Sequence, residues 1–158
     1  MVEQLRVRDL TDADRAAIAA WRYPGALSIY DPGEGAAALR SPDHVAFIDE
    51  HDDLLGYGTL GAEARVPGGC YEANEATVDV GLGLRPDRVG HRLGGLALEA
   101  LAAYVGRDGS VRQLRATVAA SNARATAFVR AEGFDERSRF VRQADGRAFV
   151  IYVRAVGG

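Results

Sequence analysis

One stretch constrains this chain more than any other: an alternating apolar segment that leads through a glycine-rich turn into a helical pattern. Residues 78–84 place apolar side chains at every second position, which predicts a strand. Residues 93–104 carry leucine and alanine at helical spacing. The turn between them can present main-chain N–H groups at a helix N-terminus, where the helix dipole also favours negative charge. This pattern predicts a site for an anionic group, most naturally a pyrophosphate.

The predicted strand has two different faces. Valine and leucine at 78, 80, 82 and 84 lie on one face, and Asp79, Gly81 and Gly83 lie on the other. Glycines on one face leave the main chain uncovered, so we expect a ligand to lie against this face.

The rest of the sequence predicts an α/β (α+β) fold in one domain covering residues 1–158. Hydrophobic residues make up 47% of the chain, and no repeat or linker divides it. Periodicity and turn residues predict strands over 2–10, 45–49, 54–60, 76–84, 114–119, 136–142 and 149–154, with helices over 11–23, 34–40, 90–105 and 122–132. This order predicts a mostly antiparallel, mixed sheet of seven strands flanked by four helices.

Composition excludes several classes of function. All 19 residues in the Lys+Arg total are arginine, which excludes Schiff-base lysines and Walker-type phosphate loops. One cysteine and 3 histidines argue against a disulfide framework and against a metal site. The net charge of -3 argues against nucleic-acid partners. We expect a cytoplasmic protein without a membrane segment, because the chain starts with charged residues and its longest apolar stretch is short.

Two segments resemble the GNAT acetyltransferase superfamily. After Pro86, the positions of that family's acetyl-CoA signature fall on Val89, Gly90, Arg92 and Gly94, and the first and third of these depart from the usual Arg or Gln and Gly. Residues 122–134 match its N-x-x-A-x-x-x-Y-x-x-x-G-F pattern, except that Val129 replaces the tyrosine. The resemblance extends over essentially the whole chain and implies a GNAT-like sheet.

The resemblance also implies which residues hold acetyl-CoA. Main-chain groups of Leu82, Gly83 and Leu84 would hold the pantetheine arm. The pyrophosphate would lie on Val89, Gly90, His91, Arg92, Leu93, Gly94 and Gly95. Asn122 would contact the pantetheine, and Phe128 is expected either to contact the cofactor or to lie in the core.

Two further sets of residues have both a functional and a structural interpretation. Asp79 lies where many family members have a general base, but a strand carboxylate paired with an arginine is the alternative interpretation. Trp21, Tyr23, Tyr30 and Asp31 lie in the family's acceptor-binding region and could surround a cation. Large aromatic residues at these positions could instead pin the first helices to the sheet.

These observations predict an acetyl-CoA-dependent N-acetyltransferase, in which a primary amine of a small molecule or peptide attacks the thioester directly. The loss of the signature tyrosine at Val129 and glycine at Arg92 keeps an alternative open, an acyl-CoA-binding module with weakened catalysis. A dinucleotide oxidoreductase is disfavoured, because Pro86 lies where the third glycine of that motif belongs. Members of the family are often dimers, which makes a homodimer one expected assembly.

Overall fold

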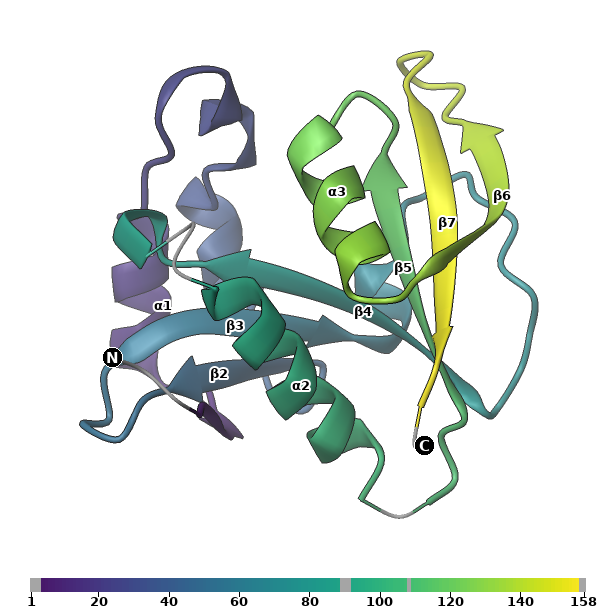
Figure 1. The fold of residues 1–158 in the computed structure, drawn as a ribbon. Coiled ribbons are helices and arrows are strands. Elements are labelled where there is room, and N and C mark those ends of the chain that lie inside the picture. The colour runs from purple at the N-terminus through teal and green to yellow at the C-terminus, as the bar shows by residue number, and fades with distance from the viewer. Residues whose placement is uncertain (1–3, 89–91, 108, 157–158) are drawn as a thin grey trace. The chain divides into compact units, whose positions relative to one another are not determined.

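The computed structural model describes residues 4–88, 92–107 and 109–156 (Figure 1). The strands are β1 (Arg6–Asp9), β2 (His44–Ile48), β3 (Leu54–Leu60), β4 (Thr77–Leu84), β5 (Gln113–Ala119), β6 (Asp135–Val141) and β7 (Ala148–Ala155). The α-helices are α1 (Asp12–Ala19), α2 (Leu93–Val105) and α3 (Ala123–Ala131). Short 3-10 helices cover η1 (Gly25–Tyr30), η2 (Gly33–Ala38), η3 (Gly61–Ala64) and η4 (Pro86–Arg88).

The strands follow the order β1-β2-β3-β4-β5-β7-β6 in a seven-stranded sheet. The pairs β1–β2, β2–β3, β5–β7 and β6–β7 are antiparallel, whereas β4 and β5 are parallel. The mixed, mostly antiparallel sheet expected from the sequence is therefore confirmed. The fourth helix, expected over 34–40, is the 3-10 helix η2, and the sequence did not predict η1, η3 or η4.

Contacts divide the chain into two compact units. Unit 1 comprises Met1–Thr59 and Leu82–Leu101, and unit 2 comprises Leu60–Gly81 and Ala102–Gly158. Both β4 and α2 contribute residues to both units. The expectation of a single domain stays a prediction.

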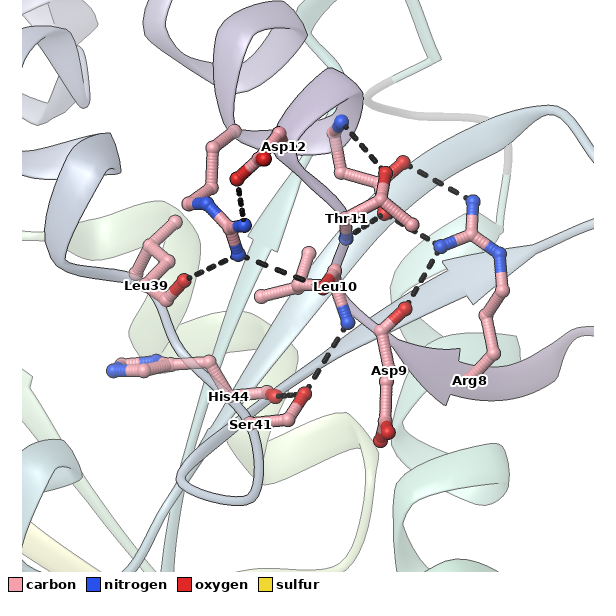
Figure 2. Close-up of polar contacts among 10 residues, drawn as sticks. Arg8, Asp9, Leu10, Thr11, Asp12, Leu39, Ser41 and His44 are labelled. Carbon is pink, nitrogen blue, oxygen red and sulfur yellow. Dashed lines mark hydrogen bonds and ion pairs between the residues drawn. The ribbon is translucent and has the colours of Figure 1, made fainter.

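A network of side-chain bonds fixes the start of α1 in unit 1 (Figure 2). The Thr11 hydroxyl accepts from the Asp14 main-chain N–H, and the Asp14 carboxylate accepts from the Thr11 N–H, which is a complete capping box. Arg8 at the end of β1 donates both Nη groups to Asp14, at 2.5 and 3.1 Å. The cap that the sequence predicts at Thr11 is confirmed, and an ion pair links it to the sheet.

Unit 1 packs on both faces of β3. Neighbouring residues of a strand point to opposite faces, so the contacts of Tyr57 lie on one face of β3 and those of Gly58 lie on the other. Tyr57 stacks on Trp21, with ring centroids 6.1 Å apart, and Trp21 belongs to a buried cluster with Ile18 of α1. On the other face, a Cβ added to Gly58 would lie 3.2 Å from Leu101 of α2. The residues around α1 and α2 thus cover opposite faces of β3.

The uncovered glycine face expected for β4 is wrong at Gly83. A Cβ placed on Gly83 would lie 2.3 Å from the Tyr57 ring. The alternation along β4 is as the sequence predicts, since Leu84 points to the opposite face and its side chain approaches Gly56. Gly83 is needed here because a large aromatic side chain from β3 fills the space above this face, so a ligand could reach Gly83 only along the strand edge.

Unit 2 has its own buried core, built mainly from β5, β7 and α3. Its buried apolar side chains come from β5, from four consecutive residues of β7, from α3 and from the residue before β6: Leu114, Val118, Phe149, Val150, Ile151, Tyr152, Val129 and Phe134. Gly133, just after α3, has φ +86°, the left-handed conformation that a helix C-terminus favours. The sequence prediction of Gly133 as the helix stop is confirmed.

Substitution of Gly83 tests the packing of Tyr57. We expect Gly83→Ala to lower the free energy of unfolding by about 1–3 kcal/mol, because the new methyl group collides with a ring that is itself held by Trp21. Gly35→Ala is the matched control, since a Cβ there meets nothing within 4 Å. Denaturant unfolding of both variants measures the difference, and equal stabilities would contradict the packing.

Candidate functional site

Strand β4 is paired with β5 over only part of its length. The parallel ladder joins Thr77, Val78 and Asp79 to three residues of β5 and stops there. Strand β5, in contrast, pairs with β7 along all seven of its residues. On its β5 side, the main chain of β4 beyond Asp79 is thus left outside the ladder. Unpaired main-chain groups of this kind are the ones that an extended ligand can bind.

The N-terminus of α2 differs from those of the other two α-helices. Thr11 caps α1 and Asn122 caps α3, each through a side-chain oxygen that accepts a main-chain N–H. The residue that precedes α2 is Arg92, whose guanidinium has no acceptor and cannot cap. The first turn of α2 contains no acidic residue either. Leu93, Gly94 and Gly95 therefore begin the helix with N–H groups that lack an intrahelical partner, an arrangement that suits an anion.

Arg92 has a glycine-like main-chain conformation. Its φ is +61°, in the left-handed region that few residues other than glycine adopt. The family signature has glycine at this position. Arg92 thus keeps the main-chain geometry of that glycine but adds an exposed, positively charged side chain. Val89, Gly90 and His91, which were also expected to bind the pyrophosphate, lie outside the described residues.

Aromatic side chains line the end of β4 in unit 1. The Tyr23 hydroxyl donates to the main-chain oxygen of Leu84 at 2.5 Å. Burial raises the pKa of this hydroxyl to about 12, and nearby Tyr57 and Asp31 act in the same direction. Tyr23 therefore stays protonated and acts as a hydrogen-bond donor. This bond uses one of the main-chain groups that was expected to bind pantetheine.

Of the four residues expected to bind the acceptor, some are held in the interior or in hydrogen bonds and one is exposed to solvent. Trp21 is 8% exposed and belongs to the core of unit 1, so the pinning interpretation holds for it. The Asp31 carboxylate accepts the main-chain N–H of Tyr23 at 2.7 Å and fixes the segment between them. Tyr30, at 41% exposed, lies beside the exposed Ile29 and is accessible from solvent.

Asp79 forms a buried ion pair in unit 2. Arg115 donates Nε to Oδ1 at 2.6 Å and Nη2 to Oδ2 at 2.8 Å, and Arg65 adds a bond from Nε to Oδ2 at 2.8 Å. Burial alone would raise the pKa of Asp79, but the hydrogen bonds and charges of the two arginines lower it below its ordinary value. A carboxylate held in this way is a weak proton acceptor, so the geometry favours the arginine-pairing interpretation of Asp79.

The other expected cofactor contacts lie on α3. The side-chain oxygen of Asn122 accepts the Ala125 N–H at 3.0 Å and caps the helix. Phe128 is partly buried, and Val129, at the position of the family's tyrosine, is buried in the core of unit 2. Val129 therefore supplies packing at a position where the family pattern has a hydroxyl. Contact of Asn122 and Phe128 with a cofactor stays a prediction.

The described residues lack the features of two other kinds of site. They contain no group of three or more His, Cys, Asp or Glu side chains placed to hold a metal ion. No helix within the described ranges is long and apolar enough to cross a membrane.

The chain belongs to the acetyltransferase (GNAT) family. That family's model matches residues 10–134, which include β4, α2 and α3. A comparison with curated proteins found no match.

Solved structures of acetyltransferases share the fold. A GNAT-family acetyltransferase from Bacillus anthracis superposes with a TM-score of 0.72 at 14% identity, covering 98% of this chain and 96% of that one. Aminoglycoside acetyltransferase AAC(6')-Ib, solved with coenzyme A, gives 0.69 at 19% identity over 96% and 95%. A spermidine/spermine N-acetyltransferase from Vibrio cholerae gives 0.64 at 14% identity over 96% and 92%. At these identities the similarity establishes the fold of this chain.

Two features of the region were not found from the sequence. Tyr57 was expected only as part of a strand, and nothing in the local pattern indicates that its ring covers Gly83, on another strand. The partners of Asp79 lie 14 and 36 residues away along the chain. An acidic residue on a strand next to glycines indicates a partner, but among 19 basic residues the sequence cannot say which one.

The ion pair at Asp79 predicts a specific dependence of stability on pH. Asp79→Asn leaves Arg115 buried beside a neutral amide, so we expect a loss of about 3 kcal/mol in the free energy of unfolding at pH 7. Because the folded-state pKa of Asp79 is lowered, its contribution is complete above the unfolded value near 3.9 and disappears as the pH falls through the folded pKa.

The measurement is chemical denaturation of both proteins between pH 7 and pH 2.5. The difference in stability between the wild type and Asp79→Asn should shrink below about pH 4. Asp135→Asn, at an exposed position in unit 2, is the control and should change little at any pH. A difference for Asp79→Asn that does not vary with pH would refute the ion pair.

Proposed function

We propose that this protein is an acetyl-CoA-dependent N-acetyltransferase that transfers an acetyl group to a primary amine. The observation that carries the proposal is the α2 N-terminus, which follows β4 in the chain; among the described residues, Arg92 before it offers no capping acceptor and its first turn holds no acidic residue. Membership of the acetyltransferase family supports the same ligand. Of the residues described, Leu93, Gly94 and Gly95 would offer main-chain N–H groups to the pyrophosphate of acetyl-CoA, and Arg92 would add a positive charge.

The pantetheine arm would bind to β4 beyond its ladder with β5. Leu82 and Gly83 lie in this part of the strand, and the oxygen of Leu84 is already used by Tyr23. An extended arm with amide groups matches the hydrogen-bond spacing of a strand edge. Binding would therefore rely on main-chain groups. The departures from the family signature at Arg92 and Val129 change side chains, so they would affect this binding little.

The chemistry proposed is direct attack. The amine nitrogen forms a bond to the thioester carbonyl carbon, the C–S bond breaks, and coenzyme A leaves as a thiolate. The amine proton passes to solvent water, because Asp79 is held by two arginines. The thiol of coenzyme A has a pKa of about 8.5, so its thiolate can take a proton from water. The step therefore needs no general-acid tyrosine at the position that Val129 occupies.

The acceptor proposed is a small-molecule or peptide amine. Trp21 and Tyr23 shape the region near the end of β4, and Tyr30 exposes an aromatic face that could contact a cation. The similar structures include enzymes named for spermidine and for aminoglycosides, so polyamines are reasonable first acceptors to test.

Binding and turnover can be separated by experiment. Calorimetry should show that acetyl-CoA binds, and a thiol-release assay should show coenzyme A appearing with at least one amine among spermidine, ribostamycin and short peptides. Binding without release on any amine would favour the alternative, a binding module that has lost catalysis. Absence of acetyl-CoA binding would contradict both.

Charge reversal at Arg92 tests where the phosphates lie. We expect Arg92→Glu to weaken acetyl-CoA binding at least tenfold, because it removes one charge-assisted hydrogen bond and adds repulsion. A negatively charged glutamate at a helix N-terminus interacts favourably with the helix dipole, so the variant should keep its fold. Arg40→Glu, at another exposed position of unit 1, is the matched control and should change the affinity less than twofold. Equal effects of both variants would place the phosphates elsewhere.

The role of Asp79 in turnover has its own test. We expect Asp79→Asn to lower the rate by a similar factor at every pH at which the protein is folded, because the residue supports structure. A general base would instead alter the shape of the pH–rate profile on its acidic side. The profile measured between pH 6 and pH 9 distinguishes these outcomes.

A further inference from the structure

Unit 2 contains a cavity of about 250 Å³ that the proposed acetyl transfer does not use. Its floor is formed by alternate residues of neighbouring strands, among them Gln113 and Arg115 of β5 and Val153 of β7. Its rim comes from the loop before β4 and from β6. None of the lining residues was expected to bind acetyl-CoA or the acceptor amine.

Two amide side chains in the lining have a fixed orientation. Asn74 Oδ1 accepts the main-chain N–H of Ala76 at 2.9 Å, and Gln113 Oε1 accepts from the Thr77 hydroxyl at 3.1 Å. In both residues the oxygen is thus used by the protein, which leaves the NH2 group as the available end. Asn74 is exposed and Gln113 is partly exposed, and the described hydrogen bonds of both side chains use the oxygen alone. Each is therefore a donor available to a ligand.

Two guanidinium groups add further donors and positive charge. Arg115 lies in the lining, but it shares the single carboxylate of Asp79 with Arg65, so these three groups together carry one net positive charge. Arg137 is 59% exposed, and its only described ion pair is to the exposed Glu72 at 3.8 Å. A surface pair at this separation is weak, so Arg137 can turn toward a ligand at little cost.

We propose that this cavity is a second binding site, which takes a compact anion with a carboxylate or phosphate group. The lining holds one carboxylate, that of Glu72, against two guanidinium groups and two amide NH2 groups, and such donors match the acceptor oxygens of these anions. Ile151 and Val153 supply apolar surface for a short carbon chain. The volume lies below the roughly 300–1,000 Å³ of pockets for drug-sized ligands, which favours a compact anion.

The probes are sodium phosphate and sodium succinate, each titrated into the full chain at constant ionic strength. Two-dimensional NMR of the side-chain NH2 groups reports directly on the groups that carry the proposal. We expect saturable shifts of the Gln113 and Asn74 signals with at least one probe, and the probe that binds more tightly distinguishes phosphate from carboxylate ligands. The signal of Gln143, an exposed glutamine in the β6–β7 turn, should not saturate. The absence of a saturable shift with both probes would overturn the proposal.

Isosteric substitutions provide a matched pair. Gln113→Glu keeps an oxygen for the Thr77 hydroxyl but replaces the NH2 donor with a second carboxylate oxygen. We therefore expect the affinity for the probe that binds, phosphate or succinate, to fall at least tenfold. Gln143→Glu makes the same charge change outside the cavity and should alter affinity less than twofold. Glu72→Gln removes the competing carboxylate beside Arg137 and should tighten binding. Equal effects of Gln113→Glu and Gln143→Glu would refute the site, and Asn74→Asp takes the place of Gln113→Glu if that variant does not fold.

Discussion

The buried ion pair of Asp79 with Arg115 is the interaction on which the pairing of β4 with β5 depends. It joins β4 to β5 at the last residue pair of their parallel ladder. An ion pair with good geometry and a second arginine compensates for the removal of these charges from water. Beyond this point, the main chain of β4 is left outside the ladder with β5. One half of the strand is thus paired on this side, and the other half is the one that we propose binds acetyl-CoA.

The second constraint is the way in which the helices begin. Both α1 and α3 satisfy their first N–H groups with side chains, whereas α2 begins after an arginine in a left-handed conformation. A helix that begins in this way leaves its dipole and its N–H groups available to an anion. The departure of Arg92 from the family signature therefore changes the side chain while keeping the main-chain geometry that the turn requires.

The strands and the three α-helices could be predicted from the sequence because their patterns are local, whereas three of the short 3-10 helices were missed. The opposite facing of Gly83 and Leu84 in β4, the cap at Thr11 and the stop at Gly133 each depend on a few neighbouring residues, and the structure confirms all three. The environment of Gly83 and the partners of Asp79 could not be predicted, because each is set by residues distant in the sequence. The same limit applies to Trp21, since an aromatic residue that packs on Tyr57 and one that contacts a substrate look alike in a sequence.

The most direct test of the central claim is a backbone NMR titration with acetyl-CoA. If main-chain groups of β4 and the α2 N-terminus hold the ligand, the largest amide shifts should fall on residues 82–84 and 92–95, and they should saturate together. Desulfo-coenzyme A should shift the same amides, because the claim concerns the pyrophosphate and the pantetheine arm. Saturable shifts confined to other parts of the chain, with these residues unmoved, would contradict it.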